Sequence, residues 1–236
     1  MMHRSWIIVP ALRAEAVAQA VAAGADVVVL DLVEFVVERD RATARAAVKE
    51  AVSTVRAAGA SVYVQTTPAC AEVDLSAAVA PGLAGVLLSR TETPGDVTAV
   101  AEGIARLEGE RGIAAGTVRL VAALETAEGN HHAYDIARAT PRVWGLTLGR
   151  ADLVMDLRAE PSGELHLLPY LMQRLILIAG ASGRVPLGAW WQHPDRGLLA
   201  TPEATRRAGE RGRAIGYRGG LCIEPAQVAA LNAAYS

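Results

Sequence analysis

The chain has 236 residues, of which 52% are hydrophobic and 20% are charged, and this composition excludes a disordered protein. The 23 basic and 25 acidic residues leave a net charge of −2, so the charge balance gives no indication of a nucleic-acid partner. No apolar stretch is long enough for a membrane span, and the four-residue apolar run before Pro10 is too short for a signal-peptide core.

Short apolar runs alternate with longer helical patterns along the whole chain. The runs, which we interpret as strands, lie at Ser5–Val9, Val27–Asp31, Ser61–Thr66, Ala84–Ser89, Val118–Leu124, Val143–Leu148, Val185–Trp191 and Gly220–Ile223. Alanine-rich segments with apolar residues at helical spacing lie between them, notably Arg13–Ala23, Asp40–Ala58, Asp96–Glu110, Pro169–Ala181 and Pro202–Ile215. Proline opens the last two, where a missing N–H group costs nothing.

This alternation is typical of repeated βα units around a buried parallel sheet. Eight such strands in a chain of 236 residues predict one (β/α)₈ barrel domain over residues 1–236. The alternative is a doubly wound open sheet. That fold usually needs fewer strands, and no G-x-G-x-x-G motif follows the first strand.

Polar residues follow most of the predicted strands at their C-terminal ends, where barrel enzymes carry their reactive groups. In chain order they are Asp31, Glu34, Gln65, Thr66, Thr67, Arg90, Glu92, Glu125, Thr126, Arg150, Asp152, His193 and Glu224. Glu125 and Asp152 follow neighbouring strands, and Mg²⁺ needs few protein carboxylates because water and substrate oxygens complete its shell. The residues therefore suggest Mg²⁺ that polarises a bound oxo acid.

A structural role competes with the functional one at each of these positions. An acidic residue after a barrel strand often caps the next helix, and this alternative stays open for Asp152. Glu125 follows an apolar run, where a buried unpaired carboxylate is costly, so a ligand or partner is favoured there. His193 lies in a loop beside Pro194 and is a candidate for substrate contact.

Lysine and cysteine usage restricts the chemistry and the setting. Lys49 is the only lysine beside 22 arginines, and its charged, helical surroundings predict a solvated surface position. Imine chemistry is therefore not expected, because arginine cannot replace a lysine that must lose its proton. Cys70 and Cys222 show no metal-binding spacing and no disulfide framework, so we expect a reducing, cytoplasmic setting.

Six groups of residues occur in the order and spacing of a known family. They are Arg4–Arg13, Gly24–Asp26 with Leu30–Leu32, Val86–Arg90 with Glu92 and Pro94, Leu124–Ala127, Leu148–Leu153 with Asp156, and Glu224–Val228. Through them almost the whole chain resembles the citrate lyase β-subunit-like branch of the HpcH/HpaI aldolase superfamily. The resemblance implies a (β/α)₈ barrel, a homo-oligomer (trimer or hexamer), and a Mg²⁺-dependent carbon–carbon lyase or condensing enzyme, with Mn²⁺ as the alternative ion.

The resemblance also implies a substrate class and a metal site. Such enzymes commonly act on coenzyme A thioesters of 3-hydroxy acids. The family's metal ligands are the glutamate of an L-I-E-T-A motif and the aspartate of an F-G-x-x-D-L motif, which correspond to Glu125 and Asp152. These are the acidic residues that strand-end position also selects.

The chain departs from the family pattern beside those ligands. In the motif L-D-L-E-D-A-V, Val33 replaces one acid and Glu34 replaces the following aspartate. In V-R-V-N, Gln65 replaces the arginine expected to hold a substrate carboxylate or enolate oxygen, where one donor contributes about 3–4 kcal/mol. Glu224 replaces a histidine, and the chain ends at Ser236 where the family's lyases usually continue into a segment that closes over the site. We therefore expect a substrate different from the ordinary one.

These residues together predict a mechanism on a small oxo or hydroxy acid or its coenzyme A thioester. Mg²⁺ on Glu125 and Asp152 would chelate the acid and stabilise an enolate, and retro-aldol cleavage or its reverse would follow. The candidate acid/base is Glu34, with Asp31 as a second. Contacts to substrate are expected from Arg13, Arg90, Thr67 and His193, and Gln65 would supply at most a neutral hydrogen bond. The alternatives are thioester hydrolysis, a biosynthetic condensation, and a non-catalytic barrel subunit.

Overall fold

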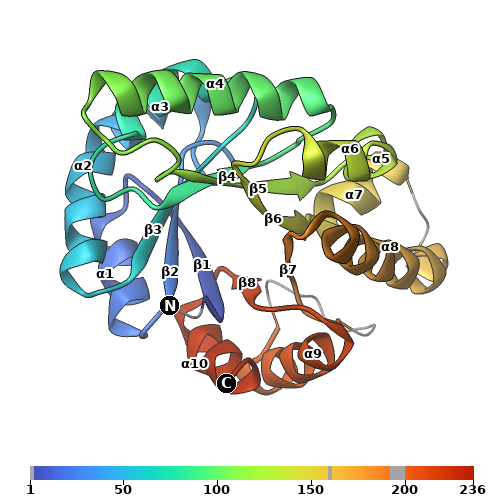
Figure 1. Ribbon diagram of the computed structural model, residues 1–236. Coiled ribbons are helices and arrows are strands. Elements are labelled where there is room, and N and C mark those ends of the chain that lie inside the picture. The colour runs from blue at the N-terminus through green and yellow to red at the C-terminus, as the bar shows by residue number, and fades with distance from the viewer. Residues whose placement is uncertain (1–2, 159–160, 192–199) are drawn as a thin grey trace.

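The computed structural model describes residues 3–158, 161–191 and 200–236, with the backbone alone for residues 161–167. Its eight parallel strands form one sheet in the order β7-β6-β5-β4-β3-β2-β1-β8. They are β1 (Ser5–Pro10), β2 (Val27–Asp31), β3 (Ser61–Thr66), β4 (Gly85–Leu88), β5 (Arg119–Leu124), β6 (Val143–Leu148), β7 (Val185–Leu187) and β8 (Gly220–Cys222). Helices surround the strands, and the two chain ends lie near each other beside α10 (Figure 1).

Backbone hydrogen bonds also connect the two end strands of the sheet. The N–H of Gly188, just after β7, donates to the carbonyl of Gly219 over 2.7 Å, and the N–H of Arg218 donates to the carbonyl of Pro186 over 3.0 Å. The (β/α)₈ barrel predicted from the sequence is confirmed. The seventh strand was expected to reach Trp191 but ends at Leu187, because the chain there turns to meet the segment before β8.

The helices follow the strands as expected, with shifted ends. They are α1 (Ala14–Ala22), η1 (Glu38–Asp40), α2 (Arg41–Ala57), α3 (Ala71–Ala78), α4 (Pro94–Glu110), α5 (Ala127–His131), α6 (Ala133–Arg138), α7 (Arg150–Leu157), α8 (Pro161–Ser182), α9 (Pro202–Ile215) and α10 (Pro225–Ala234). The expected helix start at Pro169 is wrong, because α8 begins at Pro161 and contains Pro169. Lys49 is exposed on α2, as predicted. None of the described helices has the length and apolar character that a bilayer crossing needs.

Strand residues alternate between two hydrophobic cores. One core packs between the sheet and the helices. The other fills the inside of the barrel with residues from alternate strand positions: Trp6, Ile8, Val27, Val29, Tyr63, Leu87, Val121, Ala123 and Leu187. Asp31, Gln65 and Glu125 each follow a member of this inner core by two residues. The period of two therefore points these three side chains into the barrel at the C-terminal ends of the strands.

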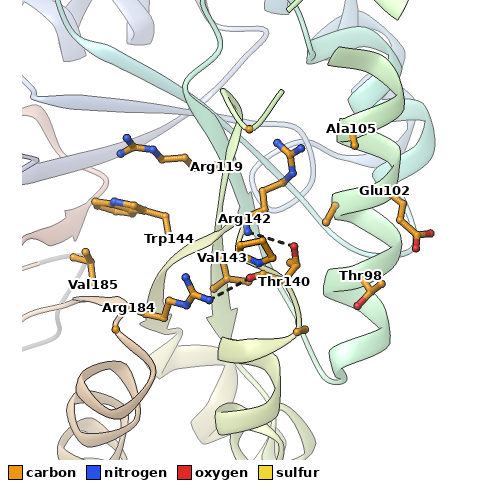
Figure 2. A pocket seen from close by; sticks show the side chains of 15 residues that line it. Thr98, Glu102, Ala105, Arg119, Thr140, Arg142, Val143, Trp144, Arg184 and Val185 are labelled. Atoms are coloured by element: carbon orange, nitrogen blue, oxygen red, sulfur yellow. Dashed lines mark hydrogen bonds between the residues drawn. The ribbon is translucent and has the colours of Figure 1, made fainter. Parts of the chain in front are cut away.

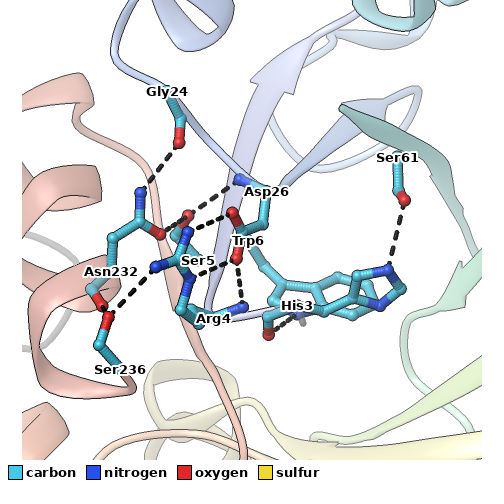
Figure 3. Close-up of polar contacts among 9 residues, drawn as sticks. All are labelled: His3, Arg4, Ser5, Trp6, Gly24, Asp26, Ser61, Asn232 and Ser236. Atoms are coloured by element: carbon cyan, nitrogen blue, oxygen red, sulfur yellow. Dashed lines mark hydrogen bonds and ion pairs between the residues drawn. The ribbon is translucent and has the colours of Figure 1, made fainter. Parts of the chain in front are cut away.

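Polar contacts at the opposite end connect the first strand to the last helix (Figure 3). The Arg4 guanidinium donates to both carboxylate oxygens of Asp26, over 2.8 and 2.9 Å, and to the Ser236 hydroxyl over 3.1 Å. Ser5 Oγ donates to Asn232 Oδ1 over 2.7 Å, and the Asn232 amide donates to the carbonyl of Gly24 over 2.9 Å. The N-terminal ends of β1 and β2 are thereby tied to α10.

A buried ion pair fixes the start of the two strands that lead to Glu125 and Asp152. Glu108 of α4 accepts hydrogen bonds from Arg142 over 2.8 and 3.0 Å, and their side chains are only 2% and 10% exposed. Glu108 also accepts from the N–H groups of Gly116 and Val118, just before β5. Burial alone would raise the pKa of Glu108, but Arg142 and these N–H groups outweigh it and hold the pKa below its ordinary value.

We predict that Arg142→Met lowers the free energy of unfolding by about 3–5 kcal/mol, because it leaves the buried Glu108 carboxylate without its counter-ion. The matched control is Arg106→Met, which breaks an exposed ion pair with Glu110 and should change stability by at most about 1 kcal/mol. Urea denaturation at pH 7 measures both variants. Equal stabilities of the two would contradict the assigned role of the buried pair.

The same pair predicts a pH dependence. A carboxylate whose pKa is lower in the folded chain stabilises it above the unfolded-state pKa, and this contribution disappears as pH falls through the lowered folded value. The stability difference between the wild type and Glu108→Gln should therefore be largest near neutral pH and shrink on acidification. A difference that stays constant between neutral pH and acid denaturation would contradict the lowered pKa.

Candidate active site

The side chain of Glu125 is buried at the C-terminal end of the barrel. It follows β5 directly, its residue is 8% exposed, and its Oε2 accepts the backbone N–H of Arg90 over 2.7 Å. Burial, aided by the charges of Asp152 and Glu34, raises the pKa of Glu125 to about 8 although the Arg90 N–H and charge oppose this. A carboxyl group in this position gains from any bound cation that replaces its proton.

Two features of the backbone bind the Glu125 side chain and leave room for it. Arg90 adopts a left-handed conformation with φ of 50°, which directs its N–H group to Glu125. Gly149 lies so close that an added Cβ would be 2.2 Å from Cγ of Glu125, so no larger residue fits there without displacing the carboxylate. Strained backbone of this kind is typical of functional sites.

Two further carboxylates lie close enough to act on Glu125. Asp152 is half-buried in the first turn of α7, and Glu34 is an exposed residue of the loop after β2. Partial burial, together with the charges of Asp152 and Asp31, raises the pKa of Glu34. The sequence singled out Glu34, Glu125 and Asp152, and the structure brings them into one electrostatic cluster.

The donor set of this cluster fits Mg²⁺. Among the described residues no three Asp, Glu, His or Cys side chains converge as a complete set of metal ligands. Mg²⁺ does not require such a set, since it usually takes one or two carboxylates and keeps several waters or substrate oxygens. A buried carboxylate that has acidic neighbours and, within residues 3–158, 161–191 and 200–236, only a backbone hydrogen bond is an arrangement that a hard divalent cation stabilises.

Asp31 shapes the loop that carries Glu34. Its side chain is fully buried and accepts the backbone N–H groups of Val33, Glu34 and Phe35 over 3.1, 2.9 and 2.8 Å. Burial still raises the pKa of Asp31, because these three bonds and the Arg41 charge only partly compensate for the loss of hydration. The observed contacts make Asp31 a positioning residue for Glu34.

Arginine side chains carry positive charge to the rim of the site. The Arg90 guanidinium is exposed, and its charge opposes but does not cancel the rise in the pKa of Glu34 and Glu125. Arg41, at the start of α2, opposes the rise in the pKa of Asp31 and Glu34 in the same way. Arg41 was missed in the sequence, although it is the first helical residue after the Glu34 loop. Arg13 is exposed before α1, and in the described part of the chain no contact joins it to these carboxylates.

Gln65 lies beside the carboxylates and forms an incomplete hydrogen-bond network. Its side chain is 4% exposed, and its Nε2 donates to Ser89 Oγ over 2.8 Å. Its Oε1 is buried and has no hydrogen-bond partner among the described residues. Ser89 was not singled out in the sequence, although it follows the inner-core residue Leu87 by two positions. Thr67 is half-buried, and its carbonyl accepts the N–H of Cys70.

The remaining strand-end residues have local structural contacts or lie outside the described residues. Thr126 caps α5 by accepting the N–H of Gly129 over 3.1 Å, and Thr66 donates to the buried Asp74. The N–H of Glu224 donates to Gln227 at the start of α10. His193 lies outside the described residues, so its predicted substrate contact stays a prediction.

A cavity of about 650 Å³ lies at the other end of the strands (Figure 2). Its lining includes Arg119, Arg142, Trp144 and Arg184, all at or before the N-terminal ends of β5, β6 and β7. Arg142 is bound to Glu108, and Arg184 donates to the carbonyl of Ala137 over 2.8 Å. Since this end of a barrel serves stability, the carboxylate cluster is the better candidate for chemistry.

Known proteins are similar to almost the whole of this chain. A "citrate lyase subunit beta-like protein" from Deinococcus radiodurans is 31% identical, with 96% of this chain and 77% of the relative aligned. A (3S)-malyl-CoA thioesterase from Cereibacter sphaeroides is 27% identical, with 99% and 77% aligned. The crystal structure of a citrate lyase β-subunit from Mycobacterium tuberculosis with oxaloacetate and magnesium is 26% identical, has a TM-score of 0.76, and covers 99% of this chain and 97% of that one.

The family assignment rests on the profile of a whole family as well as on single relatives. Residues 4–225 match the HpcH/HpaI aldolase/citrate lyase family, a range that contains every strand of the barrel and the complete carboxylate cluster. The resemblance seen in the sequence is thereby confirmed: the chain belongs to the HpcH/HpaI aldolase/citrate lyase family.

Proposed function

We propose that the barrel mouth binds Mg²⁺ through Glu125 and Asp152 and catalyses carbon–carbon bond cleavage, or its reverse, on a small oxo or hydroxy acid or its coenzyme A thioester. The observation that carries the proposal is the Glu125 carboxylate, which is buried near other acids and whose hydrogen-bond partner among the described residues is a backbone N–H. The related M. tuberculosis protein, whose structure contains magnesium and oxaloacetate, supports the same ion and ligand class here.

The bound ion would supply Lewis acidity that stabilises negative charge developing on a substrate oxygen. Glu34 is the acid/base group that gives a proton to the substrate or takes one from it. Its raised pKa favours the protonated form that a general acid needs. Asp31 keeps the Glu34 loop in place. The guanidinium groups of Arg90 and Arg41 bind and orient anionic substrate groups, such as a carboxylate or the phosphates of coenzyme A.

Thioester hydrolysis is the second candidate reaction. A relative that is 27% identical over 99% of this chain is named a (3S)-malyl-CoA thioesterase, so the family includes hydrolysis as well as cleavage. In this chain the neutral Gln65 occupies the position of the family arginine, which removes one positive charge from the place where an enolate oxygen would form. This substitution disfavours cleavage relative to hydrolysis.

Product analysis separates the two reactions. The wild type, incubated with malyl-CoA and citramalyl-CoA in the presence of Mg²⁺, should release acetyl-CoA with glyoxylate or pyruvate if it is a lyase. It should release free coenzyme A with malate or citramalate if it is a hydrolase. Either activity should fall at least about 100-fold in Glu125→Gln, as expected for the loss of an electrostatic catalytic group. Turnover that survives this substitution would overturn the proposal.

Metal binding gives a direct test of the two proposed ligands. Glu125→Gln and Asp152→Asn should each weaken Mg²⁺ binding by at least about tenfold, the smallest loss that even outer-shell partners of a metal produce. The matched control is Asp135→Asn on α6, where the carboxylate is exposed. Titration calorimetry measures all four proteins, and unchanged affinity in both site variants would remove the assignment.

The raised pKa of Glu125 also predicts how metal binding depends on pH. Below about 8 the Glu125 carboxyl group holds a proton that Mg²⁺ must displace, so the affinity should increase as the pH rises toward 8 and level off above it. The same pH series on Glu125→Gln should be much flatter. An affinity that decreases with rising pH would contradict this assignment.

Lys49 provides a test of the alternative aldolase chemistry. An imine mechanism needs a lysine in the site, but Lys49 is exposed on α2 and is the only lysine in the chain. Treatment with pyruvate and borohydride should therefore leave the wild-type mass unchanged, and Lys49→Arg should retain full activity. A covalent pyruvate adduct on Lys49 would show that the mechanism is of the imine class.

A further inference from the structure

The buried amide of Gln65 has one hydrogen-bonding group in use and one without a partner. Its Nε2 donates to Ser89, while its Oε1 is enclosed with no donor in reach among the described residues. The residue is only 4% exposed, so bulk water does not solvate this oxygen. A buried acceptor without a donor is costly, and a bound group that supplies a donor removes that cost.

Ser89 binds the nitrogen end of the Gln65 amide. It is fully buried at the end of β4, and its own N–H donates to the carbonyl of Thr66 over 2.9 Å, which fixes its backbone. With Ser89 Oγ accepting from Nε2, the carbonyl end of the Gln65 amide is the end that stays free. Gln65 thus presents an acceptor, whereas an arginine presents only donors.

Gln65 lies at the end of the barrel that also holds the carboxylate cluster. Gln65 follows the inner-core residue Tyr63 by two positions and pairs in register with Asp31 on β2. Its partner Ser89 immediately precedes Arg90, whose N–H group binds Glu125. A ligand in contact with Glu125 and Asp152 would therefore also meet the Gln65 amide.

We infer that Gln65 is a specificity-determining residue that selects substrates carrying an uncharged hydrogen-bond donor, a hydroxyl or amide N–H group, and disfavours a second carboxylate at that position. The inference rests on the proposed function, because it names the substrate class of the same site. Its physical basis is that two acceptors, Oε1 and a carboxylate oxygen, repel each other, whereas a donor group satisfies the free oxygen.

Four 2-oxo acids that share one core test this selection. Pyruvate carries no further polar group, hydroxypyruvate adds a hydroxyl, 2-oxosuccinamate adds an amide, and oxaloacetate adds a carboxylate. In calorimetric titrations with Mg²⁺ present, the wild type should bind hydroxypyruvate or 2-oxosuccinamate at least about tenfold more tightly than oxaloacetate, the size of one net neutral hydrogen bond. Whichever of hydroxypyruvate and 2-oxosuccinamate binds more tightly shows whether the preferred donor is a hydroxyl or an amide N–H group.

Substitutions at Gln65 should change which of the substituted acids binds most tightly. Gln65→Met, which keeps the volume but loses the acceptor, should bring the three substituted acids to within about threefold of one another. Gln65→Arg should reverse the order and favour oxaloacetate by at least about tenfold. Pyruvate that still binds to both variants shows that the site remains folded. Gln19→Met, at an exposed position on α1, is the matched control.

The outcomes separate this inference from the proposed function. A wild type that binds pyruvate with Mg²⁺ but prefers oxaloacetate, or shows no preference, overturns the role of Gln65 and leaves the metal site intact. A wild type that binds none of the four acids in the presence of Mg²⁺ overturns the proposed function and the inference together. A preference that persists in Gln65→Met would show that another residue makes the selection.

Discussion

The burial of one carboxylate, that of Glu125, is the constraint on which the rest of the site depends. A carboxyl group enclosed at the end of a barrel strand loses hydration, and its pKa rises to about 8 in consequence. The chain accommodates this group with a left-handed Arg90, whose N–H reaches one oxygen, and with Gly149, where a Cβ would overlap the side chain. The largest energetic cost of this arrangement is the loss of hydration of the carboxylate, and a bound cation would offset it.

The two ends of the barrel have different roles. At the N-terminal end, aromatic rings of Trp6, Tyr63 and Trp144 pack together with centroids 4.7 to 5.8 Å apart, and the ion pairs of Arg4 and Arg142 secure the strand starts. At the C-terminal end, the inner positions turn polar and their charges lie close together. The packed N-terminal end of the barrel thus holds in place a polar C-terminal end, where the carboxylates repel one another.

The sequence predicted most of the fold because each apolar run corresponds to a strand and the order of the strands follows the chain. It misplaced the end of β7, since the residues after Leu187 stay apolar although the chain has left the sheet. It also placed Pro169 at a helix start, because sequence rules put proline in the first turn of a helix more readily than in its interior. The short helices α3, α5 and α6 are too brief to give a clear helical period.

The site could be predicted only in part, for a physical reason. Glu125, Asp31 and Gln65 follow from the period of two that continues each inner strand face. The contact of Ser89 with Gln65 and the backbone role of Arg90 depend on segments far apart in the sequence. The Arg90 N–H meets a carboxylate 35 positions away, and Ser89 lies 24 positions from Gln65. No local pattern carries such information.

A crystal structure of this protein with Mg²⁺ and pyruvate would show directly whether Glu125 and Asp152 bind the ion. We expect one ion bound by carboxylate oxygens of Glu125 and Asp152 at about 2.0–2.1 Å, with pyruvate and water completing an octahedral shell. An ion bound elsewhere, or a Glu125 that at saturating Mg²⁺ still contacts only the Arg90 N–H group, would contradict it.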